Sequence, residues 1–484
     1  MKPYYDKIRK VKTHSGATAV QIGRYKGKRF ELIKHIGSAH DTEKISELMN
    51  IARAYIRSHA EQLELKYNAY SEEVMFTRGI QVEKSTLGEA FSYLSGVYER
   101  IGFSKLGSEI LKHFAIIRVL EPASKAKSVV LLNKYFDIQY KKTTVFRQLE
   151  ELVNLKEQVI NRAIQYAKDH LQFDFSLIFY DVTTLYFETF TQDEFRRNGF
   201  SKDNKLNQPQ ILIGLVVDKT GFPIYYDIFS GNTFEGKTII PIISALKQRY
   251  TIRKFTVVAD AGMLSENNLQ ELEKAGIDYI VGARSGYLSI TEARSIANKL
   301  DKVDKRVIKH DAILYEYSTA RARKDKADND KAILKAQYYL QNPSAAMRRL
   351  RFLSDIGKKD FILNEKLIEK HRLLEGIKGY KTNITDVSEQ LLIARYHDLW
   401  KIEQSFRIAK SDLEARPIYH RKELSIQYHF LIVFVALCMT RVIEQEKGKS
   451  VRQVVDELKD KWTITLKDEI SGNSVNILIN KKPH

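Results

Sequence analysis

The sequence predicts an α/β protein whose central domain is a mixed sheet flanked by helices and interrupted by an inserted subdomain. Five apolar, strand-like segments lie between residues 173 and 285, in the order β-β-β-α-β-α-β. Helical apolar spacing dominates residues 86–170 and returns from about residue 387. The 484-residue chain is 43% hydrophobic and 29% charged, which suits a globular protein of several domains.

The N-terminal segments predict two small regions ahead of this sheet. Residues 1–85 form an N-terminal β-hairpin and helix region, because residues 1–36 alternate around turn signals and residues 41–69 have helical spacing. Asp41 or Thr42 is the expected N-cap of that helix. Residues 86–172 form a helical, possible DNA-binding domain; its Lys- and Arg-bearing helices suit helix-turn-helix binding and plain helical packing equally well.

The central strands are read from apolar runs bounded by turn signals. The first and fourth runs, FDFSLIFYDVTTLYFE and FTVVADAG, are nearly continuous, as expected for strands buried on both faces. Asp218–Gly221 is a turn between the second and third strands, and a later helix has Ser265 as N-cap and Gly276 as its stop. The element order is that of a ribonuclease H-like core.

The remaining boundaries follow from where this pattern stops and resumes. We predict the first part of the core at 173–285, an insertion subdomain at 286–372 and the second part at 373–445. The last segment, 446–484, is a C-terminal tail region with helical and then strand-like composition.

Two aspartates are the first candidates for chemistry. Asp181 and Asp260 each follow an apolar run, LIFY and TVVA, so each is expected where a buried strand ends at the sheet edge. If the first and fourth strands are neighbours, the two carboxylates converge. Their repulsion is tolerable when a cation lies between them, and oxygen ligands favour magnesium or manganese. Either aspartate alone could be a cap or turn residue, and it is the pair at matching strand ends that favours a functional site.

The third candidate acid lies on a predicted helix after residue 387. Its polar stripe carries Tyr396, Glu403, Arg407 and Lys410 at spacings of seven, four and three, which share one helix face. An apolar stripe runs beside it. The simplest alternative is an ordinary amphipathic helix with a Glu–Arg pair one turn apart.

This segment resembles the signature helix of bacterial insertion-sequence DDE transposases that carry an insertion before their catalytic Glu. Their pattern is Tyr, two residues, Arg, three residues, Glu, six residues, Lys, and Tyr396, Leu399, Glu403 and Lys410 stand at that spacing. YDVTTLYFE resembles the family's first-aspartate block, VVADAGMLSENNL its second, and SGNTFEGKT its glycine–asparagine segment. SGATAVQIG and KHIGSAH resemble the start of one branch of the group.

The resemblance implies catalytic and metal-binding roles for Asp181, Asp260 and Glu403, which would hold two Mg²⁺ or Mn²⁺ ions. It also implies that Lys410 and Tyr396 bind DNA phosphates. Leu399 occupies the signature's Arg position, so a phosphate contact made by that Arg would have to come from elsewhere. Arg407 lies on the right face and is our choice, with Arg395 close by.

The implied activity is cut-and-paste DNA transposition, in which element ends are cleaved and strands transferred into target DNA. The formal charge of +19 favours a polyanionic partner. We expect double-stranded DNA, with the terminal inverted repeats and target DNA as substrates, and a homodimer in the DNA complex. No membrane partner is expected, and the expected location is the bacterial cytoplasm, with the nucleoid.

Other chemistry has little support in the sequence. One cysteine, Cys438, excludes a disulfide within the chain and a cysteine-rich zinc site. His397, His420 and His429 lie near the Glu403 helix without ligand spacing. Two rival functions stay open: a ribonuclease H-like nuclease or resolvase that cuts without joining, and a catalytically silent DNA-binding protein derived from a transposase.

Overall fold

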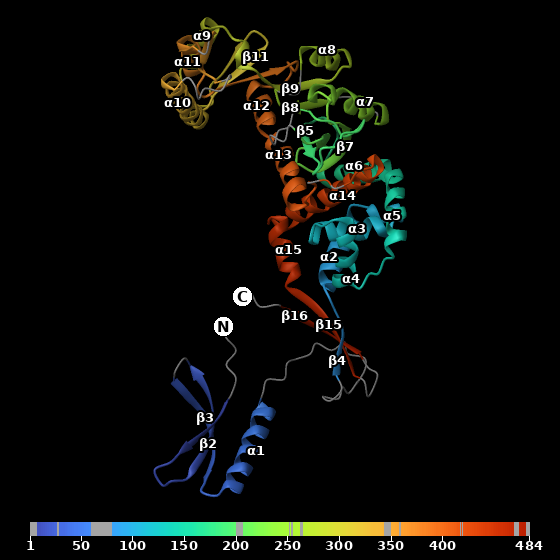
Figure 1. The fold of residues 1–484 in the computed structure, drawn as a ribbon, viewed down its shortest axis with the longest axis vertical. Coiled ribbons are helices and arrows are strands. Elements are labelled where there is room, and N and C mark those ends of the chain that lie inside the picture. The colour runs from blue at the N-terminus through green and yellow to red at the C-terminus, as the bar shows by residue number, and fades with distance from the viewer. Residues whose placement is uncertain are drawn as a thin grey trace. The chain divides into compact units, whose positions relative to one another are not determined.

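The computed structural model describes two compact units of the chain, residues 1–79 and 80–484 (Figure 1). The described residues are 7–26, 29–59, 80–199, 207–250, 252, 255–261, 265–342, 350–357, 360–416, 418, 420–468 and 474–480.

The first unit is a small antiparallel sheet with one helix. Its elements are β1 (Lys7–Lys12), β2 (Thr18–Lys26), β3 (Arg29–Ala39) and α1 (Thr42–His59). The strands lie in the order β1-β2-β3, so the predicted hairpin is one part of a three-stranded sheet. Asp41 caps the helix, since its Oδ1 accepts the Glu43 backbone N–H at 3.1 Å. The predicted helix residues 60–69 lie outside the described residues.

A layer of helices opens the second unit. It consists of α2 (Gly88–Arg100), α3 (Glu109–Leu120), α4 (Lys125–Phe136), α5 (Lys142–Glu151) and α6 (Lys156–Leu171). Ser108 and Ser124 cap α3 and α4 by accepting backbone N–H groups of the first turn. Ahead of this layer, β4 (Ile80–Thr86) pairs with β15 (Lys461–Asp468), which also pairs with β16 (Ser474–Asn480).

The central sheet has eight strands in the order β10-β11-β14-β9-β8-β5-β6-β7. Its ribonuclease H-like part is β5 (Ile178–Tyr186), β6 (Gln210–Val217), β7 (Pro223–Ser230), β8 (Thr256–Ala259) and β9 (Asp278–Ala283). β5, β6 and β7 pair antiparallel in sequence, whereas β8 runs parallel to both β5 and β9. Nearly every residue of β5 and β6 is buried, as the apolar runs predicted. The predicted fold is therefore confirmed.

The predicted insertion extends this sheet as well as interrupting it. It contains α9 (Ile290–Leu300), β10 (Val307–His310), β11 (Ile313–Tyr317), α10 (Thr319–Gln341), β12 (Leu353–Gly357), β13 (Asp360–Leu363) and α11 (Glu365–Leu373). β11 pairs with β14 (Ile377–Thr382), which pairs with β9. The helices gather beyond β11 (Figure 1) around a small separate core that includes Ile296 and Tyr315. The domain boundaries stay predictions.

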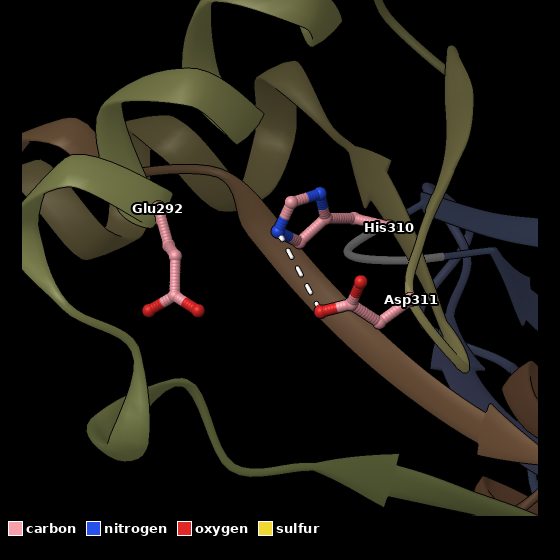
Figure 2. Close-up of side chains that lie close together, drawn as sticks. All are labelled: Glu292, His310 and Asp311. Atoms are coloured by element: carbon pink, nitrogen blue, oxygen red, sulfur yellow. Dashed lines mark ion pairs between the residues drawn. The ribbon is translucent and has the colours of Figure 1, made fainter.

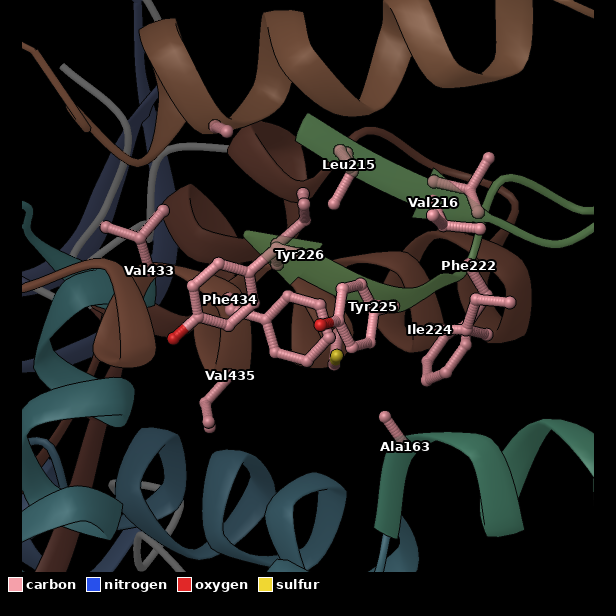
Figure 3. Packing of buried hydrophobic residues seen from close by; sticks show 14 of the residues in the cluster. Ala163, Leu215, Val216, Phe222, Ile224, Tyr225, Tyr226, Val433, Phe434 and Val435 are labelled. Atoms are coloured by element: carbon pink, nitrogen blue, oxygen red, sulfur yellow. The ribbon is translucent and has the colours of Figure 1, made fainter. Parts of the chain in front are cut away.

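One long apolar helix joins the sheet to the helical layer. α14 (Glu423–Lys447) contacts β7 on one side and α3 on the other, while α7 (Ile239–Arg249), α8 (Glu266–Lys274) and α15 (Val451–Lys459) complete the unit. In Figure 3, Phe434 of α14 lies against Tyr226 of β7, with ring centroids 4.9 Å apart. By length and composition α14 is apolar enough to cross a membrane, and 94% of its apolar window is buried within the protein.

Candidate active site

Adjacent parallel strands bring the two predicted aspartates together. Ile178 of β5 pairs with Val257 of β8, and Phe179 pairs with Val258. The same register, continued by two residues, sets Asp181 beside Asp260. Neighbouring strands lie about 4.8 Å apart, and partners in register point to the same face. The predicted convergence of these two carboxylates is therefore built into the sheet.

The position of Asp181 differs from the prediction. Asp260 follows the last residue of β8, as expected, but Asp181 lies within β5, which continues to Tyr186. The strand continues because its residues remain paired with antiparallel β6, Asp181 itself facing Leu215. What ends beside Asp181 is the parallel neighbour β8, so the carboxylate still reaches an open part of the sheet.

Backbone and side-chain donors orient the two carboxylates. The half-buried Asp181 accepts the Val182 backbone N–H at 2.7 Å. The exposed Asp260 accepts the Ala261 N–H at 2.8 Å and the Tyr396 hydroxyl at 3.2 Å through the same oxygen, Oδ1. Each carboxylate oxygen has two lone pairs, so a carboxylate that accepts hydrogen bonds can also ligate a cation.

Glu403 reaches this face from a helix that packs on the same strand. The predicted long helix is divided into α12 (Glu389–His397), α13 (Trp400–Arg407) and a π-helical turn (Ile408–Asp412). Between α12 and α13 the backbone bonds tighten to three-residue spacing, as in Leu399 N–H to Tyr396 C=O at 3.0 Å. α13 contacts β5 and β6, and its Ile402 and Phe406 are buried, while Glu403 is exposed.

Tyr396 connects the second and third acids. Its side chain is 3% exposed. Burial raises the pKa of the Tyr396 hydroxyl, and the nearby charges of Asp260 and Glu403 raise it further. The charge of Glu403 therefore influences the same Tyr396 hydroxyl that donates a hydrogen bond to Asp260. The predicted phosphate contact of Tyr396 stays a prediction, and the contact observed is the one to Asp260.

The three acids are not drawn into one tight cluster. Within the described part of the chain, three potential metal-ligating side chains lie within 4.8 Å of one another at Glu292, His310 and Asp311 only. Asp181, Asp260 and Glu403 do not meet that limit, so at least one separation among their nearest oxygens exceeds it.

Lys378, on β14, lies at the candidate site, although no pattern in the sequence indicates it. Its Nζ lies 4.4 Å from the centre of the Tyr396 ring. Burial lowers the pKa of Lys378, with Arg321 adding to the effect, while Asp260, Glu403 and Glu316 counteract it. No motif marks this lysine, because β14 joins the core sheet only after the whole insertion.

The other predicted phosphate-binding residues lie along the α13 segment. Arg407 is exposed one turn beyond Glu403. Lys410 is half-buried in the π-helical turn and lines a small apolar cavity with Thr183 and Leu185. Thr183 and Leu185 follow Asp181 at two-residue spacing on β5, so they lie on the same face of the strand as Asp181. Leu399 is 7% exposed, so the signature's Arg position faces the core in this protein.

The compact cluster of Glu292, His310 and Asp311 lies at the edge of the insertion. It lines a cavity of about 560 Å³ that Ala261 and Gly282 also line. Figure 2 shows His310 and Asp311 joined by an ion pair, 3.9 Å between Nε2 and Oδ2, with Glu292 opposite. Glu292 belongs to the capping box of α9, where its Oε2 accepts the Ser289 N–H at 2.6 Å. A structural role therefore accounts for Glu292.

With this geometry in place, similarity to known proteins decides the family. The sequence profile of the transposase DDE domain matches residues 172–439, more than half of the chain. The chain belongs to the transposase DDE domain family. This match spans the strands, insertion and helices that carry Asp181, Asp260 and Glu403, and the resemblance found in the sequence is thereby confirmed.

Two solved structures are similar to parts of this DDE-domain protein. The Mos1 transposase paired-end complex with left transposon end is 13% identical, with 48% of this chain and 66% of that chain covered and a TM-score of 0.16. The Mos1 mariner paired end complex with Mn is 12% identical, with coverage of 52% and 78% and a TM-score of 0.16. The chain thus spans just under two thirds of the first structure. No curated protein matches the sequence.

Proposed function

We propose that this protein is a metal-dependent DNA transposase that cleaves element ends and joins them to target DNA. The observation that supports the proposal is the register of β5 and β8, which, continued by two residues, would bring Asp181 beside Asp260, together with the contact of the Glu403-bearing helix α13 with β5. Family membership supports the same reaction class.

The donor set suits hard divalent cations. All three candidate ligands are carboxylates, and Asp181 and Asp260 share one face of adjacent strands. Like charges this close repel, and bound Mg²⁺ or Mn²⁺ would relieve the repulsion. When bound, such ions activate an attacking oxygen and stabilise the leaving oxygen in phosphoryl transfer. Asp181, Asp260 and Glu403 would hold two ions.

The chain's own groups position DNA and the acids. Tyr396 fixes Asp260 through its hydroxyl, and Lys378 brings a positive charge beside Asp260 and Glu403. Arg407 and Lys410, on the Glu403 segment, would bind phosphates of the DNA strand. In cleavage, a water oxygen bonds to phosphorus as the bond to the 3′-oxygen breaks, which leaves a 3′-hydroxyl and a 5′-phosphate. In joining, that 3′-hydroxyl oxygen loses its proton and bonds to the phosphorus of a target phosphodiester, while the bond to the target's own 3′-oxygen breaks and this oxygen leaves as a hydroxyl.

The formal charge of +19 supports duplex DNA as the partner, with element ends and target DNA as the two substrates. Pairing two ends in one complex implies a homodimer as the working form.

The test is cleavage and joining by Asp181→Asn, using a duplex that carries the sequences flanking the gene. We expect Mg²⁺-dependent cleavage to fall by at least about 10³-fold, the scale set by losing a main electrostatic group, while DNA binding persists. Asp169→Asn, an exposed acid on α6, is the matched control. Nicking retained by Asp181→Asn would contradict the assignment. Joined donor–target products separate transposition from cleavage alone.

A further inference from the structure

The small sheet of β4, β15 and β16 has one apolar face. β15 is its central strand and pairs antiparallel with both neighbours. Partners in register point to the same face of a sheet, and side chains alternate between the faces along a strand. On one face, the paired positions of β15 and β16 therefore carry only apolar side chains: Trp462 with Ile479, Ile464 with Ile477, and Leu466 with Val475.

Only one end of this face is covered by the rest of the second unit. Trp462 packs against Tyr135 of α4, with ring centroids 6.1 Å apart. The hydrophobic cores that the described residues form do not include the apolar side chains beyond Trp462. β15 and β16 extend from the end of α15, away from the helical layer (Figure 1). An apolar surface of this kind marks an interaction site.

The outer strand of this sheet, β16, lacks the charges that usually protect a sheet edge. An edge strand has unpaired N–H and C=O groups that can pair with another strand, and charged side chains oppose such pairing. Every other edge strand of the described sheets carries at least one charged residue. β4, at the opposite edge of the same sheet, has Glu83 and Lys84, whereas β16, SVNILIN, has none. β16 is therefore suited to pairing.

The sequence of β16 is complementary to itself. When two copies of this strand pair antiparallel about a two-fold axis at Ile477, each Ile477 faces the other and Val475 faces the partner's Ile479. These residues all lie on the apolar face, so that face continues from one copy to the next. On the other face, Asn476 lies opposite the partner's Leu478, and no like charges meet.

We propose that β16 is a dimer interface, where it pairs antiparallel with β16 of a second copy of this chain. The choice of a second copy rests on the proposed function, which brings two element ends together in one complex. The two small sheets join into one six-stranded sheet. Because seven residues a side form a small interface, the DNA-free dimer is expected to be weak, with a dissociation constant in the micromolar range.

The test compares Ile477→Lys with Val82→Lys. Val82 lies on the same apolar face, opposite Leu466, but on the far strand β4, and it is 63% exposed. The mass of the DNA-free full chain is measured by sedimentation velocity across a concentration series. We expect Ile477→Lys to raise the dimer dissociation constant at least about tenfold, because two lysines face each other at the axis, while Val82→Lys dimerises like the wild type.

Two results of this comparison would overturn the proposal. The first is a wild type that stays monomeric well above micromolar concentration, or an Ile477→Lys variant that dimerises as well as the wild type. The second is an equal loss of dimers in both variants, which would assign the contact to the apolar face instead of the edge strand.

A mixture of opposite charges tests the register of the pairing. Ile477→Glu alone is expected to be as monomeric as Ile477→Lys. When the two variants are mixed, lysine and glutamate face each other at the axis, so heterodimers are expected to form and to weaken at high salt. Dimers regained in the mixture would also show that both variants are folded. A mixture that stays monomeric would contradict the pairing about Ile477.

Two further measurements separate this inference from its alternatives. If the wild type is monomeric and Ile477→Lys lowers its unfolding temperature, another part of the same chain covers β16 and the proposal is wrong. If the wild type dimerises through β16 but neither cleaves nor joins DNA, the proposed function fails and the interface stands. If it cleaves and joins while Ile477→Lys still dimerises, only the interface is wrong.

Discussion

Two groups of potential metal ligands differ in how tightly they are gathered. Glu292, His310 and Asp311 lie within 4.8 Å of one another, whereas Asp181, Asp260 and Glu403 do not. Yet local structure accounts for the tight group, since Glu292 caps α9 and the other two are chain neighbours. The wider group is assembled from β5, the end of β8 and α13. We therefore propose the metal centre where distant segments converge rather than at the compact group.

The largest expected effect comes from removing a charge of the wider group. Asp260→Asn keeps the acceptor for the Tyr396 hydroxyl but loses the negative charge, so Mg²⁺-dependent cleavage is expected to fall by at least about 10³-fold. The measurement is single-turnover cleavage with DNA affinity followed in parallel. Wild-type cleavage rates in Asp260→Asn would contradict a catalytic role for Asp260 and its group.

Lys378→Met sharpens the comparison by removing the cation beside Asp260 and Glu403. We expect cleavage to slow by about 10- to 100-fold, because a positive charge near the candidate catalytic acids is lost. Lys381→Met on the same strand is the control, since the Lys381 Nζ is bound by Glu266 at 2.8 Å. Equal losses in both variants would indicate general weakening of DNA binding instead.

Tyr396→Phe tests how the acids are held in place. Removing the hydroxyl frees Asp260 Oδ1 of its 3.2 Å donor, so the Mg²⁺ concentration for half-maximal cleavage is expected to rise about tenfold. The maximal rate at saturating Mg²⁺ should change less. A loss of rate that Mg²⁺ does not rescue would instead support the phosphate-binding role predicted from the sequence.

The smallest effect on cleavage is expected in the tight group. Glu292→Ala leaves cleavage within about twofold of the wild type, but it removes the acceptor for the Ser289 backbone N–H in the capping box and lowers the unfolding temperature. Thermal unfolding and cleavage are measured on the same preparation. A large loss of Mg²⁺-dependent cleavage would indicate that the compact group, and not the wider one alone, contributes to metal-dependent catalysis.

The sequence was sufficient to predict the order of the core elements along the chain and the position of Asp260 directly after its strand, because apolar runs and turns are local signals. The prediction that Asp181 ends its strand was wrong, because the end of a strand depends on its pairing partners. β5 stays paired with β6 as far as Tyr186, well after its pairing with β8 has ended. The sequence gives no signal for the interruption between α12 and α13, because no proline or glycine lies there. The position of Lys378 near the candidate site could not be predicted for a different reason, because its neighbours come from segments far away in the chain.

The pairing of β4 with β15 has a consequence for biosynthesis. Leu466 of β15 pairs with Val82, so the two partners stand near opposite ends of the second unit's sequence. A ribosome must release nearly the whole polypeptide before this small sheet closes. A truncated product ending before Lys461 would leave β4 as an unpaired edge, which is a template for aggregation. Premature termination would thus yield an aggregation-prone fragment rather than a partly working protein.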